Sequence, residues 1–264
     1  MAIKEAKNNR GKFQMTKPFF IFIFSLFVFK ISAQTKLVVI EGGIYRPLYS
    51  LDTQRIVVKK FSLDNFQVSN AEFLTFVKKN AEWKKSKAKK IFIDQGYLGQ
   101  WTTDTSFSDS LANQPVVNVS WFAATKYCEC QGKRLATTAE WELAAQANET
   151  NKDGYKDKRF NQWLLDWVAK PQPINRRKRG STFKNVYGVY DMHGLVWEWT
   201  SDFNSALTTG ESRENGGLDK SKFCGGGSFS SKDVRNYAAF MRYAMRSSLK
   251  AKYCVANLGF RCAK

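Results

Sequence analysis

The chain has 264 residues and a formal net charge of +19 at pH 7. A chain of this length fits one domain with a sizeable core, so a multidomain organisation is not needed. The positive charge favours anionic partners, but nucleic acid is excluded if the chain is exported, as its first residues predict.

Residues 1–33 have the pattern of a targeting segment. A basic residue precedes an apolar run at 19–29, and the small pair Ser32-Ala33 offers a cleavage point. The run of 11 residues is short for a membrane-spanning helix, which needs about 20, so a signal peptide is favoured over a membrane anchor. We therefore expect an exported protein of the periplasm, cell envelope or extracellular space, with one domain at 34–264. That domain carries 36 basic and 22 acidic side chains, a net charge of +14.

Two segments rich in β-branched residues open the domain. Residues 35–45 and 57–68 each predict a strand. A Ser-Glu capping box at 69–72 then predicts a helix over 71–79. The polar, lysine-rich stretch 81–114 has the composition of a long surface loop.

Helix signals recur after this loop. Residues 115–119 predict a short strand, and Ser120 is placed to cap a helix over 121–131. A second capping box at 137–140 starts the helix that carries Trp141.

Charges and turn residues dominate residues 148–185. No sustained apolar period can be counted there, so we expect a loop. Short strands separated by Gly, Asn and Ser are expected at 187–192, 196–200, 223–229, 237–245 and 258–262. Few short helices, many short strands and long loops predict the α+β class.

Four blocks in fixed order carry a family resemblance across most of the domain. They are GGIY at 42–45, QPVVNVSWFAATKYCECQGKRLATTAEWELAA at 114–145, YGVYDMHGLVWEWTSDF at 187–203, and GGSF at 226–229 with NLGFRCA at 257–263. Together they resemble the formylglycine-generating enzyme (sulfatase-modifying factor) family. The resemblance implies a fold related to that of C-type lectins.

The resemblance also implies a disulfide between Cys128 and Cys262. The chain has five cysteines, so at least one is unpaired within a monomer. Cys224 and Cys254 are expected either to form a second bridge or to remain two buried thiols.

The resemblance implies oxidation chemistry in which two thiolates hold Cu(I), a soft ion suited to sulfur ligands. Both thiols belong between GGSF and RYAMRS, yet no cysteine lies between Cys224 and Cys254. That window instead contains Ser230, Ser231, Asp233, Arg235, Asn236 and Ala238. Serine and asparagine cannot replace thiolate toward Cu(I), so we expect no copper and no formylglycine formation.

Other family sites are altered as well. Leu195 stands where the family commonly has a calcium-binding Asn, so we expect that calcium site to be lost or weakened. A related branch uses iron held by several histidines, but His193 is the sole histidine here. We interpret His193 as a structural residue rather than a catalytic base or metal ligand.

A ligand groove is expected near Trp199, Ser228 and Ser231. In the alternating motif WEW, Trp197 and Trp199 share one face, as a core pair or as a groove wall. Two arginines set among apolar residues, Arg246 and Arg261, need buried partners. The candidate carboxylates are Glu140, Glu142 and Glu198.

Two basic runs are either solvated loops or contacts with an anionic glycan or lipid. They comprise Lys84, Lys85, Lys87, Lys89 and Lys90, and then Arg176, Arg177, Lys178 and Arg179. We expect a non-catalytic binding or scaffold module of the cell envelope, such as a part of secretion or gliding machinery. The alternatives are an oxidoreductase or maturation enzyme using other residues, and a subunit that depends on an envelope protein partner.

Overall fold

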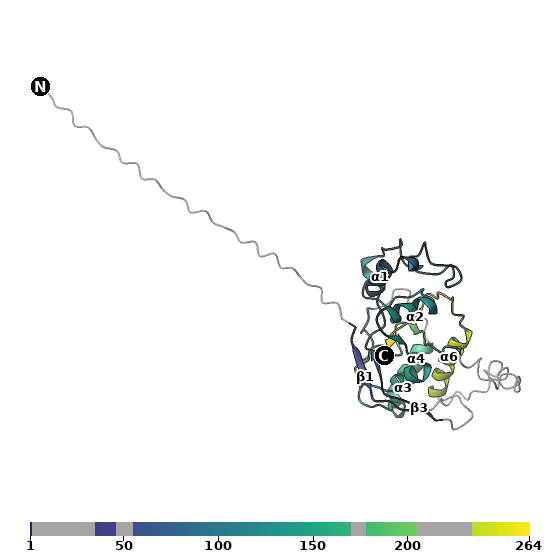
Figure 1. Ribbon diagram of the computed structural model, residues 1–264. Helices are drawn as coiled ribbons and strands as arrows, with labels where there is room; N and C mark the ends of the chain where they lie inside the picture. The colour runs from purple at the N-terminus through teal and green to yellow at the C-terminus, as the bar shows by residue number, and fades with distance from the viewer. Residues whose placement is uncertain (2–34, 46–54, 170–177, 205–233) are drawn as a thin grey trace. The chain divides into compact units, whose positions relative to one another are not determined.

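The structure, a computed structural model, describes residue 1 and residues 35–45, 55–169, 178–204 and 234–264. It has the α+β architecture that the sequence predicts (Figure 1). The helices are α1 (Asn70–Lys79), α2 (Trp121–Cys130), α3 (Thr138–Ala145), α4 (Lys158–Ala169) and α6 (Val234–Ser248), with single 3₁₀ turns at Ala81–Trp83, Asp109–Leu111 and Gly154–Lys156.

Short strands form one central sheet and two smaller pairs. The strands are β1 (Leu37–Ile40), β2 (Gly43–Tyr45), β3 (Ile56–Val58), β4 (Phe61–Asp64), β5 (Arg134–Leu135), β6 (Trp197–Glu198), β7 (Leu258–Gly259) and β8 (Cys262–Ala263). The central sheet is antiparallel with the order β1-β4-β8-β5. The pair β2-β3 is antiparallel and the pair β6-β7 is parallel.

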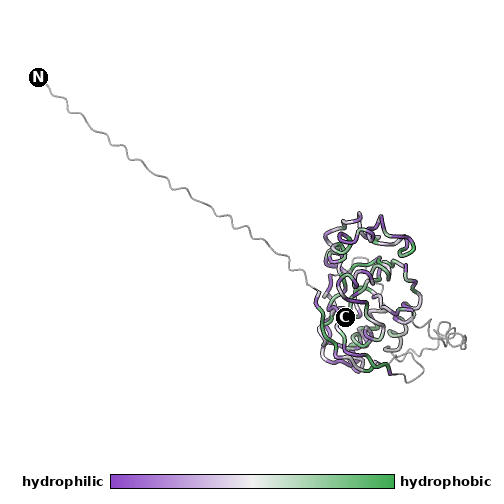
Figure 2. The backbone as a smooth tube through the Cα atoms, in the orientation of Figure 1, coloured by the Kyte–Doolittle hydropathy of each residue, from purple (hydrophilic) through white to green (hydrophobic). Residues whose placement is uncertain are grey.

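The two segments predicted as long strands are each divided in two. β1 and β2 lie within residues 35–45, whereas β3 begins one residue before the second segment and β4 lies inside it. The division falls at Gly42, whose φ of 83° suits glycine and where a Cβ would lie 2.4 Å from the Val58 carbonyl oxygen. Figure 2 shows β3 as an apolar stretch of the tube, and Val57 on it is 76% exposed.

Side-chain caps explain the three helices that the sequence predicts. Ser69 and Thr137 each close a capping box at the start of α1 and α3. Ser120 accepts the Ala123 N–H at the start of α2, while Gly132 follows its end with a φ of 65°. These predictions are confirmed to within a residue.

Several predictions of secondary structure are wrong. The strand expected over 187–192 is not formed, and Tyr190 makes only an isolated bridge with Lys184. The loop expected over 148–185 contains α4, in which Phe160, Trp163, Leu164 and Trp167 follow the helical period. The strand expected over 237–245 lies inside α6, where Ala238, Arg242 and Arg246 recur every four residues. The stretch 115–119 forms only an isolated bridge at Pro115, and the strand expected at 223–229 lies outside the described residues.

The core is largely aromatic and lies between the helices and the sheet. One cluster centres on Phe73, Tyr127, Trp199 and Phe260, and a second on Ile40, Leu63, Trp141 and Leu143. The structure contains the disulfide Cys128–Cys262 that the resemblance implies, which joins α2 to β8. In the described part of the chain, every helix is too short or too polar to cross a bilayer.

Candidate ligand-binding site

The site is built around β6, which pairs with β7 near the end of the chain. Trp197 and Trp199 donate their backbone N–H groups to the carbonyls of Asn257 (2.8 Å) and Gly259 (2.9 Å). A Cβ at Gly259 would lie 2.6 Å from the Val116 carbonyl oxygen, so this close approach requires glycine. The pairing therefore fixes where the side chains of residues 197–199 lie.

Glu198 is buried and receives hydrogen bonds on both carboxylate oxygens. Arg261 binds it with two N–H groups, each at 2.8 Å. Trp141 Nε1 donates to Oε2 (2.8 Å), and Gln67 Nε2 donates to Oε1 (2.9 Å). The predicted need of Arg261 for a buried carboxylate is confirmed.

A second buried carboxylate, Glu142, holds two arginines of α6. Arg242 Nη2 and Arg246 Nη1 donate to it at 2.7 and 2.6 Å, and Arg242 Nη2 also contacts the Tyr155 hydroxyl at 3.3 Å. Burial favours the neutral acid, but the two guanidinium charges outweigh it and lower the pKa of Glu142 to about 2. The remaining candidate, Glu140, pairs with Arg134.

His193 lies behind this cluster as a neutral side chain. Burial and then the charge of Arg242 lower its pKa to about 3. A neutral imidazole with the proton on Nε2 donates to the Ala145 carbonyl at 2.6 Å. This contact ties the motif DMHG to the end of α3.

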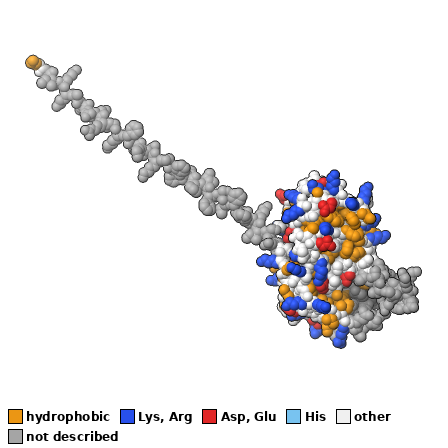
Figure 3. All heavy atoms as spheres, in the orientation of Figure 1, with side chains coloured by type: hydrophobic (Ala, Val, Ile, Leu, Met, Phe, Trp, Pro, Cys, Tyr) orange, Lys and Arg blue, Asp and Glu red, His pale blue; other side chains and the backbone are white. Residues whose placement is uncertain are grey.

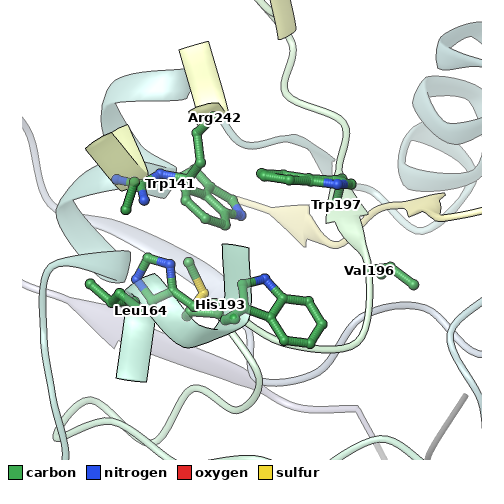
Figure 4. Close-up of a pocket in the computed structure, with 9 residues that line it drawn as sticks. Trp141, Leu164, His193, Val196, Trp197 and Arg242 are labelled. Atoms are coloured by element: carbon green, nitrogen blue, oxygen red, sulfur yellow. The ribbon is translucent and has the colours of Figure 1, made fainter. Parts of the chain in front are cut away.

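A small aromatic pocket lies beside Glu142 and His193. Figure 4 shows the indoles of Trp141 and Trp197 on one side of it and Leu164 and His193 on the other. Its interior has a volume of about 10 Å³, room for about one water molecule. The lining residues are Trp141, Leu164, Trp167, Met192, His193, Val196, Trp197, Ala238 and Arg242.

Within the described part of the chain, none of the predicted groove residues lines this pocket. Trp199 is 1% exposed and donates its Nε1–H to the Val119 carbonyl at 2.9 Å, so it is a core residue. Its neighbour Trp197, half-buried, lines the pocket instead. Ser228 and Ser231 lie outside the described residues. From the window expected to hold the two thiols, Ala238 lines the pocket with a methyl group.

Sequence reasoning missed most of the pocket wall. Leu164 and Trp167 belong to α4 and Arg242 to α6, the two helices that were not predicted. The apolar residues of α4 recur with the helical period, so the sequence contains a signal that could have located Leu164 and Trp167. No local signal places Arg242, because its partner Glu142 is 100 residues away in sequence.

The residues present do not fit the metals that the resemblance implies. Ala238 brings no sulfur to the pocket, and Leu195 packs its side chain against Val117 and Val196. The nearby Asp191 already accepts hydrogen bonds from the Gly180 and Thr182 backbone N–H groups. Over the described ranges, no group of three His, Cys, Asp or Glu side chains is placed to hold a metal ion.

The predicted basic surface also needs correction at one residue. Arg179 is 8% exposed; it donates to Glu72 Oε2 and to the Gln67 carbonyl, both at 2.7 Å, and its guanidinium lies over Phe66. Burial therefore makes it part of the interior. Lys178 is exposed, while Arg176 and Arg177 lie outside the described residues.

The two remaining described cysteines are free thiols. Cys254 is buried, which raises its pKa to about 12, and Cys130 is exposed on α2. Cys224, the candidate partner of Cys254, lies outside the described residues.

The structure is that of an α+β protein of the formylglycine-generating-enzyme fold. Residues 28–264 match the family described as Sulfatase-modifying factor enzyme 1-like domain, and the chain belongs to this family. The formylglycine-generating enzyme of Mus musculus is 30% identical over 302 residues, covering 88% of this chain and 75% of that protein.

Two further comparisons extend this result. The Inactive C-alpha-formylglycine-generating enzyme 2 of Mus musculus is 25% identical, covering 80% of this chain and 77% of that protein. The crystal structure of CarF matches with a TM-score of 0.51 at 16% identity, covering 88% of this chain and 98% of that one. The structural match supports the fold alone.

Proposed function

We propose that the protein is an exported, non-catalytic member of this family that acts as a binding or scaffold module of the cell envelope. The observation that carries the proposal is the absence of cysteine between Cys224 and Cys254. Cu(I) chemistry requires soft thiolate ligands, and the carboxylates beside the pocket are occupied by arginines. Similarity to a relative named as inactive is compatible with this role.

The pocket of Trp141 and Trp197 is the proposed contact point. The aromatic pocket has room for about one water molecule, so it can accept the end of one chemical group but not a whole small molecule. A pocket of this size suits a protein or glycan partner. The net positive charge favours an anionic glycan, an anionic lipid or an acidic envelope protein. A role in secretion or gliding machinery is one setting for such a module.

The first experiment tests the missing chemistry. The purified protein is incubated in aerobic buffer with Cu(I) and a cysteine peptide taken from a sulfatase, and the product is analysed by mass spectrometry. We expect no aldehyde, whereas the mouse formylglycine-generating enzyme serves as the positive control. Conversion of the peptide at a rate comparable to the control would overturn the proposal.

An oxidoreductase or maturation enzyme using other residues is the second candidate. It is favoured by the 30% identity to the mouse enzyme over most of the chain. This candidate requires a bound metal or cofactor in protein purified from its native envelope. Elemental analysis and absorbance of that material separate the two roles, and co-purifying proteins identify a partner of the scaffold.

A further inference from the structure

The basic segment at residues 84–91, here called the lysine turn, is a fixed structure. Backbone N–H groups of Lys87 and Ala88 both donate to the Lys84 carbonyl at 2.9 Å. Ser86 is held from outside the turn, because its backbone N–H and hydroxyl bind the Asp104 carboxylate at 2.7 and 2.6 Å. The turn therefore presents its side chains in a defined arrangement.

An isoleucine projects from the end of this turn. Ile91 is 72% exposed, whereas the next residues face the core: Phe92 packs on Trp83 and Phe122, and Ile93 is buried. The backbone N–H of Phe92 donates to the Lys89 carbonyl at 2.9 Å, which holds Ile91 at the corner of a turn. Exposure of Ile91 thus follows from the anchoring of its neighbours.

Cations precede the exposed isoleucine in the sequence. Lys87, Lys89 and Lys90 are exposed, and α1 ends just before the turn with exposed Lys78 and Lys79. The lysine turn itself contains no acid. The acids near it in the sequence are the exposed Glu82, the half-buried Asp94, which accepts the backbone N–H groups of Gly96 and Cys254, and the half-buried Asp104, which is bound to Ser86. Figure 3 shows Lys and Arg side chains distributed over the visible face of the domain, including the end that α1 occupies.

We propose that the lysine turn docks on an anionic lipid bilayer, with Ile91 entering the interface and the lysines contacting lipid phosphates. An exposed apolar side chain next to exposed cations is the pattern of interfacial membrane contacts, because the apolar group enters the acyl boundary while the cations contact the lipid headgroups. A soluble sulfated glycan uses the lysines but offers no place for Ile91. The inference narrows the anionic partner of the proposed function to a lipid bilayer and assigns it to residues other than those that line the aromatic pocket. It holds whether or not the chain is catalytic.

The test is co-sedimentation of the full protein with vesicles of phosphatidylcholine, with and without phosphatidylglycerol. Ile91→Ser is expected to weaken binding to the anionic vesicles about tenfold. Lys89→Gln with Lys90→Gln is expected to weaken it about fivefold per lysine. Retention on heparin, a sulfated glycan, should fall in the lysine variant and stay unchanged in Ile91→Ser.

Matched controls distinguish binding through this surface from non-specific adsorption to vesicles. Val57→Ser removes an equally exposed apolar residue on β3, and Lys36→Gln with Lys59→Gln removes two exposed cations elsewhere. Both controls should bind vesicles like the unmodified protein. If Ile91→Ser binds anionic vesicles normally while the lysine variant does not, the surface is a polyanion site and the bilayer proposal is wrong. Equal binding by all variants also overturns it.

Discussion

Glu142 and Glu198 show how buried acids serve structure in this protein. Each lies next to a tryptophan, Trp141, that contacts both networks: its Nε1–H donates to Glu198, and the guanidinium of Arg246 lies 4.9 Å from its ring centre. Each oxygen of both carboxylates accepts a hydrogen bond from an arginine. Breaking either network leaves an unpaired buried charge, which costs about 3–5 kcal/mol.

His193 gives the domain a predicted sensitivity to acid. Its pKa is about 3 in the folded state but about 6.5 when unfolded. Between these values the unfolded chain binds a proton that the folded chain does not, so stability falls as the pH drops below about 6.5. At about pH 5 the loss amounts to about 2 kcal/mol relative to neutral pH.

His193→Gln is expected to reduce this acid sensitivity. The glutamine amide retains an N–H group for the Ala145 carbonyl but does not titrate. Urea unfolding of both proteins at neutral pH and at about pH 5 measures the difference, with the loss smaller by about 2 kcal/mol in the variant. Identical losses in the two proteins would show that His193 is protonated in the folded state.

At the scale of elements, local signals located three helices and missed two. α1, α2 and α3 start at side chains that cap their own backbone, a contact that neighbouring residues determine. α6 carries arginines on its buried face, so an apolar period does not reveal it; its contacts with Glu142 come from the tertiary structure. α4 has the period, but turn residues before it obscured the start.

The same distinction applies to the candidate site. The need of Arg261 for a buried partner followed from the cost of burying an unpaired charge, a rule that needs no fold. The choice of Glu198 among the three candidate carboxylates comes from the tertiary structure. Trp197 and Trp199 were expected to share one face, but side chains alternate in this way only if the strand continues through both residues. β6 ends at Glu198, after which Trp199 turns into the core.

The N-terminal cap of α3 provides a test at this scale. Thr137→Ala removes the hydroxyl that accepts the Glu140 N–H, and should lower the free energy of unfolding by about 1 kcal/mol. Thr75→Ala is the matched control, since Thr75 is exposed inside α1, and should change stability by less than about 0.5 kcal/mol. Chemical denaturation of the two variants gives the comparison; equal effects would mean that the cap contributes nothing particular.

At the scale of the whole domain, the last four residues tie together distant parts of the chain. β8 pairs with both β4 and β5, and the Lys264 backbone N–H donates to the Ser62 carbonyl at 2.8 Å. Arg261 adds contacts to Glu198 and to the carbonyls of Asp64 and Tyr190. β8 therefore joins β4 to β5 within the central sheet.

The disulfide Cys128–Cys262 adds a covalent link between β8 and α2. Its sequence separation of 134 residues constrains a large part of the unfolded chain, which corresponds to about 4–5 kcal/mol in the chain-entropy account. Replacing both cysteines by alanine should lower the free energy of unfolding by about that amount, while Cys130→Ser, at an exposed thiol, should leave it unchanged. Adding a reductant should destabilise the unmodified protein and Cys130→Ser but not the double variant. If the double variant is as stable as the oxidised protein, then β8 pairing and the hydrogen bonds of Arg261 hold β8 in the sheet without the covalent bond.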